Sequence, residues 1–220
     1  MMRCACVATL WLVGSLWAGA AFAQTSAATP GPDSRFYLEL TFGPTLGHKS
    51  DKSVGVEGAM RIDDQLDGFF EGGHIGNAAT TDFEQRGQKI ANSLGASLSS
   101  VEKVNYFDVG LRYRVPVTSP KVHPYIALGV GIAHVSTETN LAINGVPVGA
   151  DVVSVGSDLS GSFNRPFIMF GFGAHLTFAT RFFGDLSYRF GRVSGATDGA
   201  DEVLAAVPTQ RIQFGVGVHF

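Results

Sequence analysis

The chain has 220 residues, of which 16% are charged, and its formal net charge is −3. This length suits one domain with short appendages, and the lack of a basic excess excludes an ordinary nucleic-acid-binding surface. Hydrophobic residues make up 45% of the chain, with 28 glycines and 17 phenylalanines. Beyond Ala23, however, no run reaches the roughly 18 apolar residues that a membrane-spanning helix needs.

Residues 1–23 have the three parts of a secretory signal peptide. Arg3 supplies the positive start, an apolar stretch follows, and an Ala-Phe-Ala motif ending at Ala23 matches the cleavage pattern. We predict cleavage before Gln24, with an uncleaved anchor as the alternative. Residues 24–34 are small, polar and proline-bearing, and we expect them to form a flexible leader before a domain over 35–220. Both cysteines lie within the signal, which leaves no disulfide or thiol nucleophile in the mature chain.

From Arg35 onward, apolar residues recur at every second position, which is the period of a β-strand with two different faces. The third of these stretches is the least regular because Phe69 and Phe70 are adjacent, and only Glu71 indicates which face is which. The eight predicted strands contain, in order, RFYLELTFG, VGVEGAMRI, DGFFEGGHIG, NYFDVGLRYRV, HPYIALGVGIAHV, PFIMFGFGAHLTF, RFFGDLSYRFG and RIQFGVGVHF.

Short and long connections alternate between these strands. This pattern is typical of an antiparallel transmembrane β-barrel with short periplasmic turns and long extracellular loops, and strands of about 9 to 11 residues can cross a bilayer when tilted. A closed barrel also satisfies every backbone amide, as lipid requires. We therefore predict an all-β, eight-stranded barrel. Helical spacing over 90–101 suggests a short helix in the second long loop, and Asn144-Gly145 suggests a hairpin in the third.

The face opposite the apolar residues carries ten charged groups, five acids and five arginines. An eight-stranded barrel is just wide enough to be filled by side chains, and buried charges must be paired. We interpret these groups as a salt-bridged plug, with a narrow gated pore or proton path as the alternative. The members are Glu39, Glu57, Arg61, Glu71, Asp108, Arg112, Arg114, Asp185, Arg189 and Arg211.

The stretches PYIALGVGIAHV, FGFGAHLTFATRFFGDLSYRFG and FGVGVHF resemble the small eight-stranded outer-membrane barrels of Gram-negative bacteria, the OmpA-like and opacity-protein-like surface antigens. The resemblance covers residues 35–220. It implies a monomeric structural or surface-interaction protein in contact with outer-membrane lipid and lipopolysaccharide, with no cofactor, metal or nucleic acid. It also implies roles in envelope integrity or adhesion, through host or cell-surface ligands at the loops. The terminal Phe220 resembles the signal that the outer-membrane assembly machinery reads.

One short motif suggests an enzyme instead. His134 and Ser136 are two residues apart, as in the outer-membrane lipid A 3-O-deacylases, which this spacing resembles. In such a site the histidine is the base, the serine is the nucleophile and an acid orients the histidine. Glu138 or Asp151 would have to supply that acid here. Polar residues are also expected where a strand leaves the membrane, so we expect no enzyme and keep the hydrolase as the alternative.

Overall fold

The computed structural model describes residues 35–47, 50–79, 81–93, 95–143, 146–148, 161–198, 201–204 and 206–220. The predicted signal peptide, its cleavage site and the predicted leader lie outside these residues. Within them, no helix has both the length and the apolar character needed to cross a membrane.

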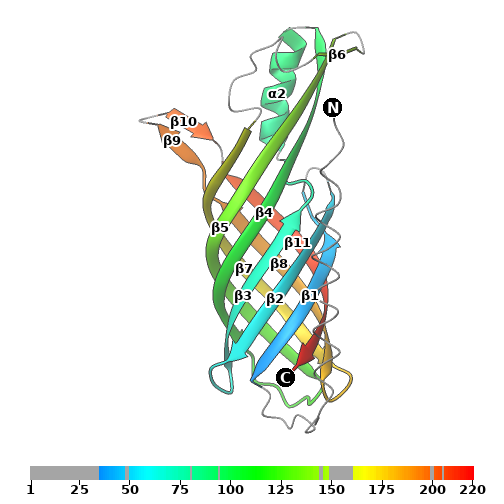
Figure 1. Ribbon diagram of the computed structural model, residues 1–220, viewed down its shortest axis with the longest axis vertical. Helices are drawn as coiled ribbons and strands as arrows, with labels where there is room; N and C mark the ends of the chain where they lie inside the picture. The colour runs from blue at the N-terminus through cyan, green and yellow to red at the C-terminus, as the bar shows by residue number, and fades with distance from the viewer. Residues whose placement is uncertain are drawn as a thin grey trace, which may run out of the picture. The chain divides into compact units, whose positions relative to one another are not determined.

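Eight strands form a closed antiparallel barrel in which each strand pairs with the next and the last pairs with the first (Figure 1). This confirms the predicted fold class. The barrel strands are β1 (Phe36–Pro44), β2 (Lys52–Arg61), β3 (Leu66–Ile75), β4 (Ala96–Arg114), β5 (Val122–Ile143), β7 (Gly161–Thr177), β8 (Phe182–Val193) and β11 (Val207–His219). The remaining elements are α2 (Thr81–Ser93), β6 (Val146–Val148), β9 (Ala196–Asp198) and β10 (Asp201–Leu204).

The closing seam joins β1 to β11. Their register runs from Tyr37 opposite His219 to Phe42 opposite Phe214, as the sequence predicted for the first and last strands. Closure leaves the barrel without an exposed sheet edge.

The outer face of the barrel is apolar and the inner face is mixed. Period-two alternation runs along the barrel strands, so most large aliphatic and phenylalanine side chains point outward, while the acids, most tyrosines and a few phenylalanines point inward. On β3 the adjacent phenylalanines separate, with Phe69 buried in the lumen and Phe70 exposed outside. Glu71 points inward, as predicted.

Glycines make room for the aromatic rings of the lumen. A Cβ on Gly129 would lie 3.3 Å from the Phe69 ring, and one on Gly191 would lie 2.5 Å from the Phe167 ring. The small inward residues of β5 leave space in this way for side chains from other strands. Aromatic bulk on one strand therefore fits against glycine on another.

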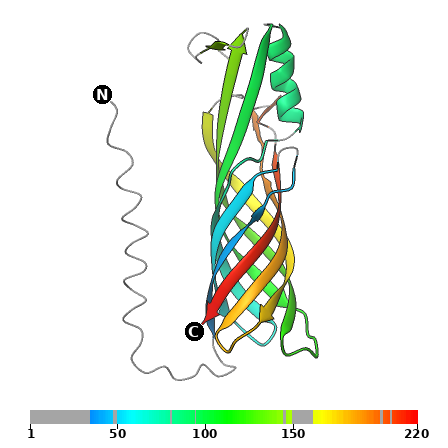
Figure 2. The same ribbon diagram turned by 90° about the vertical axis from the view of Figure 1, so that its right-hand side faces the viewer.

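The two ends of the barrel differ. Turns of 62–65, 115–121 and 178–181 join strands at the short-turn end, and the longer connections gather at the other, the long-loop end (Figure 2). Five strands exceed the predicted length of about 9 to 11 residues. The excess is small in β8 and β11, with 12 and 13 residues, and large in β4, β5 and β7, with 19, 22 and 17.

The second long loop also differs from the prediction. The helix is α2, and residues 96–101 extend β4 instead of continuing a helix. β-Pairing with β5 overrides the helical spacing there, since Ala96 lies opposite Ile143. The predicted hairpin residues 144–145 lie outside the described residues, but Ile143 pairs with Val146 on either side of them.

Candidate functional site

Glu57 is the centre of the lumen. Its Oε1 accepts hydrogen bonds from Arg112 Nη2 at 2.6 Å and from the Tyr37 hydroxyl at 2.8 Å, and its Oε2 accepts one from Arg189 Nη2 at 2.8 Å. Glu57 and both arginines have no exposed surface. One carboxylate from β2 therefore joins guanidinium groups from β4 and β8 across the lumen.

Glu71 forms a second centre, adjoining the first. The Tyr106 hydroxyl donates a 2.5 Å hydrogen bond to Glu71 Oε1. Arg189 Nη1 lies 3.7 Å and Arg211 Nη1 3.6 Å from the two carboxylate oxygens, and Arg211 stacks over the Tyr106 ring at 4.3 Å. Charges thus alternate in an unbroken chain from Arg112 through Glu57, Arg189 and Glu71 to Arg211, which we call the charge ladder.

Aromatic rings and a histidine continue the packing toward the short-turn end. Arg112 Nη1 donates to His175 Nε2 at 2.9 Å and also to the Tyr37 hydroxyl, and its guanidinium lies 4.0 Å from the centre of the Tyr125 ring. The Tyr125 hydroxyl donates to both oxygens of Asp185 at 3.0 Å. Such cation–π and hydrogen-bonded contacts partly compensate the desolvation of the arginine.

Two of the ten predicted interior residues lie at the mouth of the barrel instead of its centre. Arg61 and Arg114 end β2 and β4 at the short-turn end and are partly exposed. Arg114 Nη2 contacts Asp67 Oδ1 at 3.2 Å, an acid that the sequence analysis did not include. The eight predicted residues that are enclosed are therefore five carboxylates and three guanidinium groups, and not five of each: Glu39, Glu57, Glu71, Asp108 and Asp185 against Arg112, Arg189 and Arg211.

Two enclosed acids have little support from donors. Glu39 and Asp108 accept no hydrogen bond from the described residues. His175 Nε2 lies 3.8 Å from Glu39 Oε2, but this nitrogen accepts a hydrogen bond from Arg112 and so has no proton to donate to Glu39. Among the described residues, the hydrogen bonds of the lumen thus concentrate on Glu57, which accepts three, and burial alone does not identify the important acids.

The lumen also contains neutral members that a count of charged residues does not reveal. Tyr37, Tyr106, Tyr125 and His175 are all buried and all contact the charged groups. The alternation that placed the acids inward also places these four inward, so the signal was present in the pattern. Their hydrogen bonds depend on the register of strands across the lumen, which the pattern does not contain.

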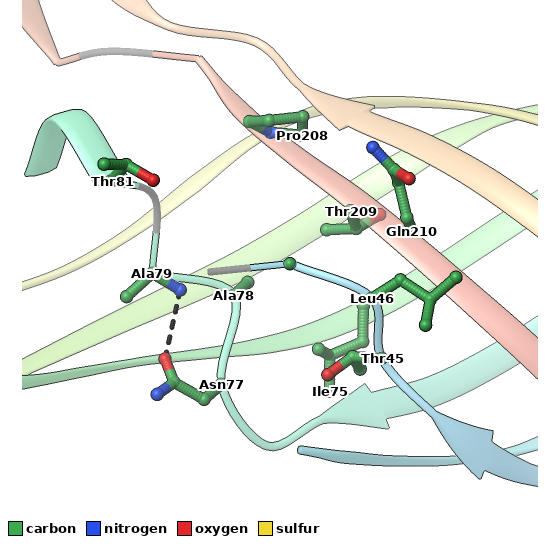
Figure 3. Close-up of a pocket in the computed structure, with 11 residues that line it drawn as sticks. Thr45, Leu46, Ile75, Asn77, Ala78, Ala79, Thr81, Pro208, Thr209 and Gln210 are labelled. Atoms are coloured by element: carbon green, nitrogen blue, oxygen red, sulfur yellow. Dashed lines mark hydrogen bonds between the residues drawn. The ribbon is translucent and has the colours of Figure 1, made fainter. Parts of the chain in front are cut away.

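A cavity of about 180 Å³ lies at the long-loop end of the lumen (Figure 3). It is lined by uncharged residues from the ends of β1, β3 and β11 and the segment before α2. The Asn77 side chain accepts hydrogen bonds from the amides of Ala79 and Glu102, which ties that segment to β4. Thr209 Oγ1 is buried here and has no hydrogen-bond partner among the described residues.

The hydrolase candidates lie outside the lumen. His134 is exposed on the outer face of β5, and its Nδ1 lies 2.8 Å from Asn164 Oδ1. Ser136 lies two residues further along β5, opposite Ser162. Glu138 bonds Lys103 at 2.7 Å, and Asp151 lies outside the described residues. An amide, and not an acid, therefore orients the histidine in the part of the chain that is described.

The terminal residue Phe220 lies beside the closing seam. Its side chain is exposed, and its backbone amide donates a hydrogen bond to Phe36 O at 2.9 Å.

Within the described residues, no three His, Cys, Asp or Glu side chains converge in a way that could hold a metal ion.

A closed barrel with an apolar exterior and a charged, enclosed interior defines a membrane protein of the transmembrane β-barrel class. Residues 13–220 match the family model described as the outer membrane protein beta-barrel domain. The protein belongs to this family and resides in the outer membrane, so the short-turn end is periplasmic and the long-loop end is extracellular. No curated protein matches the chain.

Several solved structures align with this chain. Neisserial surface protein A aligns with a TM-score of 0.52 and 15% identity, covering 84% of this chain and 97% of that one. The N-terminal barrel of Pseudomonas aeruginosa OprF aligns with a TM-score of 0.46 and 13% identity, covering 85% and 98%. The outer membrane enzyme PagL aligns with a TM-score of 0.44 and 14% identity, covering 83% and 98%. At sequence identities this low, the similarity concerns the barrel fold and not the function.

Proposed function

We propose that this protein is a non-enzymatic, non-conducting barrel that presents a folded surface to a partner outside the cell. The supporting observation is that two strands, β4 and β5, continue further than their neighbours at the long-loop end of the barrel. β4 stays paired with β5 up to Ala96 opposite Ile143, whereas β3 pairs with β4 only as far as Val104 and β7 with β5 only as far as Thr137. The ends of β4 and β5 therefore stand beyond the barrel as a ribbon.

Two further elements support this ribbon. β6 pairs with the end of β5, and α2 packs against β4 (Figure 1). Among the α2 residues whose burial is described, Gly87 and Ala91, one helical turn apart, are buried. An isolated two-stranded ribbon is only marginally stable, so a helix and a third strand give it the support it needs. We call the ribbon with α2 and β6 the extension.

The extension exposes mostly uncharged polar groups. Amide and hydroxyl side chains favour recognition by directed hydrogen bonds, which depends less on salt than recognition by charge. Among the extension residues whose burial is described, the exposed side chains of this kind are Thr81, Gln85, Gln88, Asn92, Ser97, Ser99 and Asn140.

The lumen supports the non-conducting part of the proposal. The charge ladder crosses the middle of the barrel, and the rings of Tyr37, Tyr125 and Phe183 pack around His175 below it. Eight-stranded barrels have an interior that side chains can fill. Moving this packing aside would break hydrogen bonds to fully buried arginines.

The outer face of β5 supports a non-enzymatic role. His134 is held by an amide, and Glu138, the one described candidate for the acid, is held by Lys103. Mass spectrometry of lipid A from a Gram-negative host expressing the protein tests this directly. Unchanged acylation is expected. A lost acyl chain that returns in His134→Ala would establish the hydrolase instead.

A loop-replacement experiment tests the binding role. Residues 80–100 and 139–160 are replaced by short glycine–serine linkers, and binding of whole cells to host cells or matrix is compared with that of the intact protein. We expect binding to be lost while heat-modifiable gel mobility shows a folded barrel. The matched control replaces the periplasmic turn 115–121. Equal binding by the shortened and intact proteins would contradict the proposal.

A further inference from the structure

The lumen-side residues nearest the periplasmic end of the barrel are mostly basic. Phe36 points outward at the start of β1, so Arg35 before it lies on the lumen side. Arg181 precedes the outward Phe182 of β8 in the same way. Four arginines and two histidines, at the ends of six barrel strands, belong to this set, which we call the cationic mouth. Its members are Arg35, Arg61, Arg114, His123, Arg181 and His219.

The basic groups lie close together. His219 is near enough to Arg61, Arg114 and His123 to interact with them electrostatically. Among the described strand residues that face the lumen at this level, Asp67 is the one acid, and its Oδ1 lies 3.2 Å from Arg114 Nη2. Like charges held at one opening repel each other and raise the local concentration of anions, so a bound anion would stabilise this arrangement.

The positive charge of the periplasmic end is greatest toward β5 and β8. Asp63 and Asp64 are exposed in the turn between β2 and β3, which the strand order places across the barrel from β7 and β8. Lys121 and Arg181 precede β5 and β8 on the far side (Figure 2). These two cations are therefore the ones that the acids of the turn screen least.

Aromatic rings close the lumen directly behind the cationic mouth. The centre of the Phe183 ring lies 5.3 Å from that of Tyr37 and 4.5 Å from that of His175, and all three side chains are buried. The His219 ring packs on the same phenylalanine at 4.7 Å. A ligand that enters from the periplasm therefore stops at these rings and does not reach the charge ladder.

The outer wall at the periplasmic end is apolar and aromatic, as expected where a barrel meets lipid. Phe36, Met60, Tyr113 and Phe182 point outward there, each at least 40% exposed. The cationic side chains lie on the opposite face of the same strands. The arrangement thus favours a ligand from the aqueous periplasm over a lipid headgroup.

The arginines indicate the chemistry of the ligand. Guanidinium groups bind carboxylate and phosphate oxygens through paired donors. In the cationic mouth they come from β2 and β4 and from the residues before β1 and β8, so one small anion contacts only some of them. A chain with several carboxylates contacts more, and the narrow opening of an eight-stranded barrel limits the ligand to one extended chain. An acidic peptide meets both conditions.

We propose that the cationic mouth, with Lys121 at its edge, binds an acidic peptide segment of a periplasmic partner. The carboxylates would lie against the arginines, and the ring of Phe183 would mark the depth that the peptide reaches. The site is at the opposite end of the barrel from the extension and does not depend on what the extension binds (Figure 1).

Fluorescence anisotropy of a labelled hexaglutamate peptide, with the full refolded chain in uncharged detergent micelles, tests the site. We expect binding that weakens as salt is added. In the double variant Lys121→Gln with Arg181→Gln, the affinity should fall about tenfold. The matched control is Lys52→Gln with Arg192→Gln, which removes one lysine and one arginine from exposed positions toward the extracellular end. Its affinity should equal that of the wild type.

Asp67→Asn gives a change in the opposite direction, which a loss of folding cannot imitate. The substitution removes the acid beside Arg114 and frees that guanidinium for the peptide. The affinity for hexaglutamate should rise about threefold in protein whose heat-modifiable gel mobility shows a folded barrel.

Four results would overturn the proposal. The wild type could fail to bind hexaglutamate, or the mouth variant and its matched control could bind it equally. Displacement of the peptide by inorganic phosphate at equal concentration would assign the mouth to a single small anion. Displacement by phosphatidylglycerol at equal concentration would assign it to a lipid headgroup.

Discussion

Two ion pairs of nearly equal length mark the contrast between the lumen and the extension. Arg112 and Glu57 are 2.6 Å apart with both side chains fully buried, whereas Lys103 and Glu138 are 2.7 Å apart with side chains 39% and 58% exposed. Water replaces either partner of the second pair at little cost, but it does not reach the first. Distance alone therefore says little about what an ion pair contributes to the fold.

The contrast extends to the surrounding residues. In the lumen, aromatic rings, glycines and charges from distant strands fit together in one arrangement, and each depends on the register of its neighbours. In the extension, exposed polar side chains on a helix and a ribbon can change without disturbing the barrel. We expect the lumen to determine stability and the extension to determine binding.

The largest effect is expected at Glu57. Glu57→Gln removes the charge between Arg112 and Arg189 while keeping the shape of the side chain. Breaking a buried pair in this way leaves uncompensated charge, so the free energy of unfolding should fall by about 3 kcal/mol. Urea unfolding of the refolded protein in lipid vesicles measures it. A loss too small to detect would mean that the charge ladder does not hold the barrel together.

Gly191 tests the fit of rings against glycine. Gly191→Ala would place a Cβ 2.5 Å from both the Phe167 ring and Thr209 Oγ1. Overpacking of this kind costs about 1–3 kcal/mol, again measured by urea unfolding. Gly184→Ala is the matched control, because its Cβ would meet nothing closer than 3.7 Å. Equal stability of the two variants would show that the lumen relaxes around added bulk.

Glu39 tests whether a buried carboxylate that accepts no hydrogen bond contributes to the stability of the barrel. It is buried like Glu57 but accepts no hydrogen bond from the described residues. Glu39→Gln should therefore change the free energy of unfolding by less than about 1 kcal/mol, or raise it, because a poorly paired buried charge is removed. A loss as large as that of Glu57→Gln would show that the two carboxylates contribute equally.

The smallest effect is expected in the extension. Glu138→Gln breaks the exposed pair with Lys103, and such pairs contribute about 0–1 kcal/mol. The unfolding midpoint should not move outside experimental error, and the heat-modifiable gel shift should remain. A clear loss of barrel stability would mean that the extension and the lumen are not independent.

Alternation was enough to predict the barrel and the direction of most side chains. It placed Glu57 and Arg189 inward because their neighbours on the strand are apolar and face lipid. It did not pair them, because β2 and β8 are not adjacent and their contact across the lumen depends on the stagger of the closed barrel. It also did not give the register between the neighbouring strands β3 and β4, on which the hydrogen bond from Tyr106 to Glu71 depends.

The extension was harder to predict from local patterns. Residues 96–101 have helical spacing, but they continue β4 because β5 offers a complete line of partners. The equal count of acids and arginines was also misleading, since Arg61 and Arg114 end their strands at the mouth of the barrel. The face of the barrel toward which a side chain points can be inferred from the alternating pattern. Its depth along the barrel can be inferred only when the strand ends and the register are known.

Ionic current through single refolded barrels in a planar lipid bilayer shows directly whether side chains close the lumen. With the charge ladder and the ring cluster around His175 in place, the wild-type protein should give no stepwise conductance above the bare bilayer. Reproducible open steps from the wild-type protein would contradict the closed barrel and favour a gated pore.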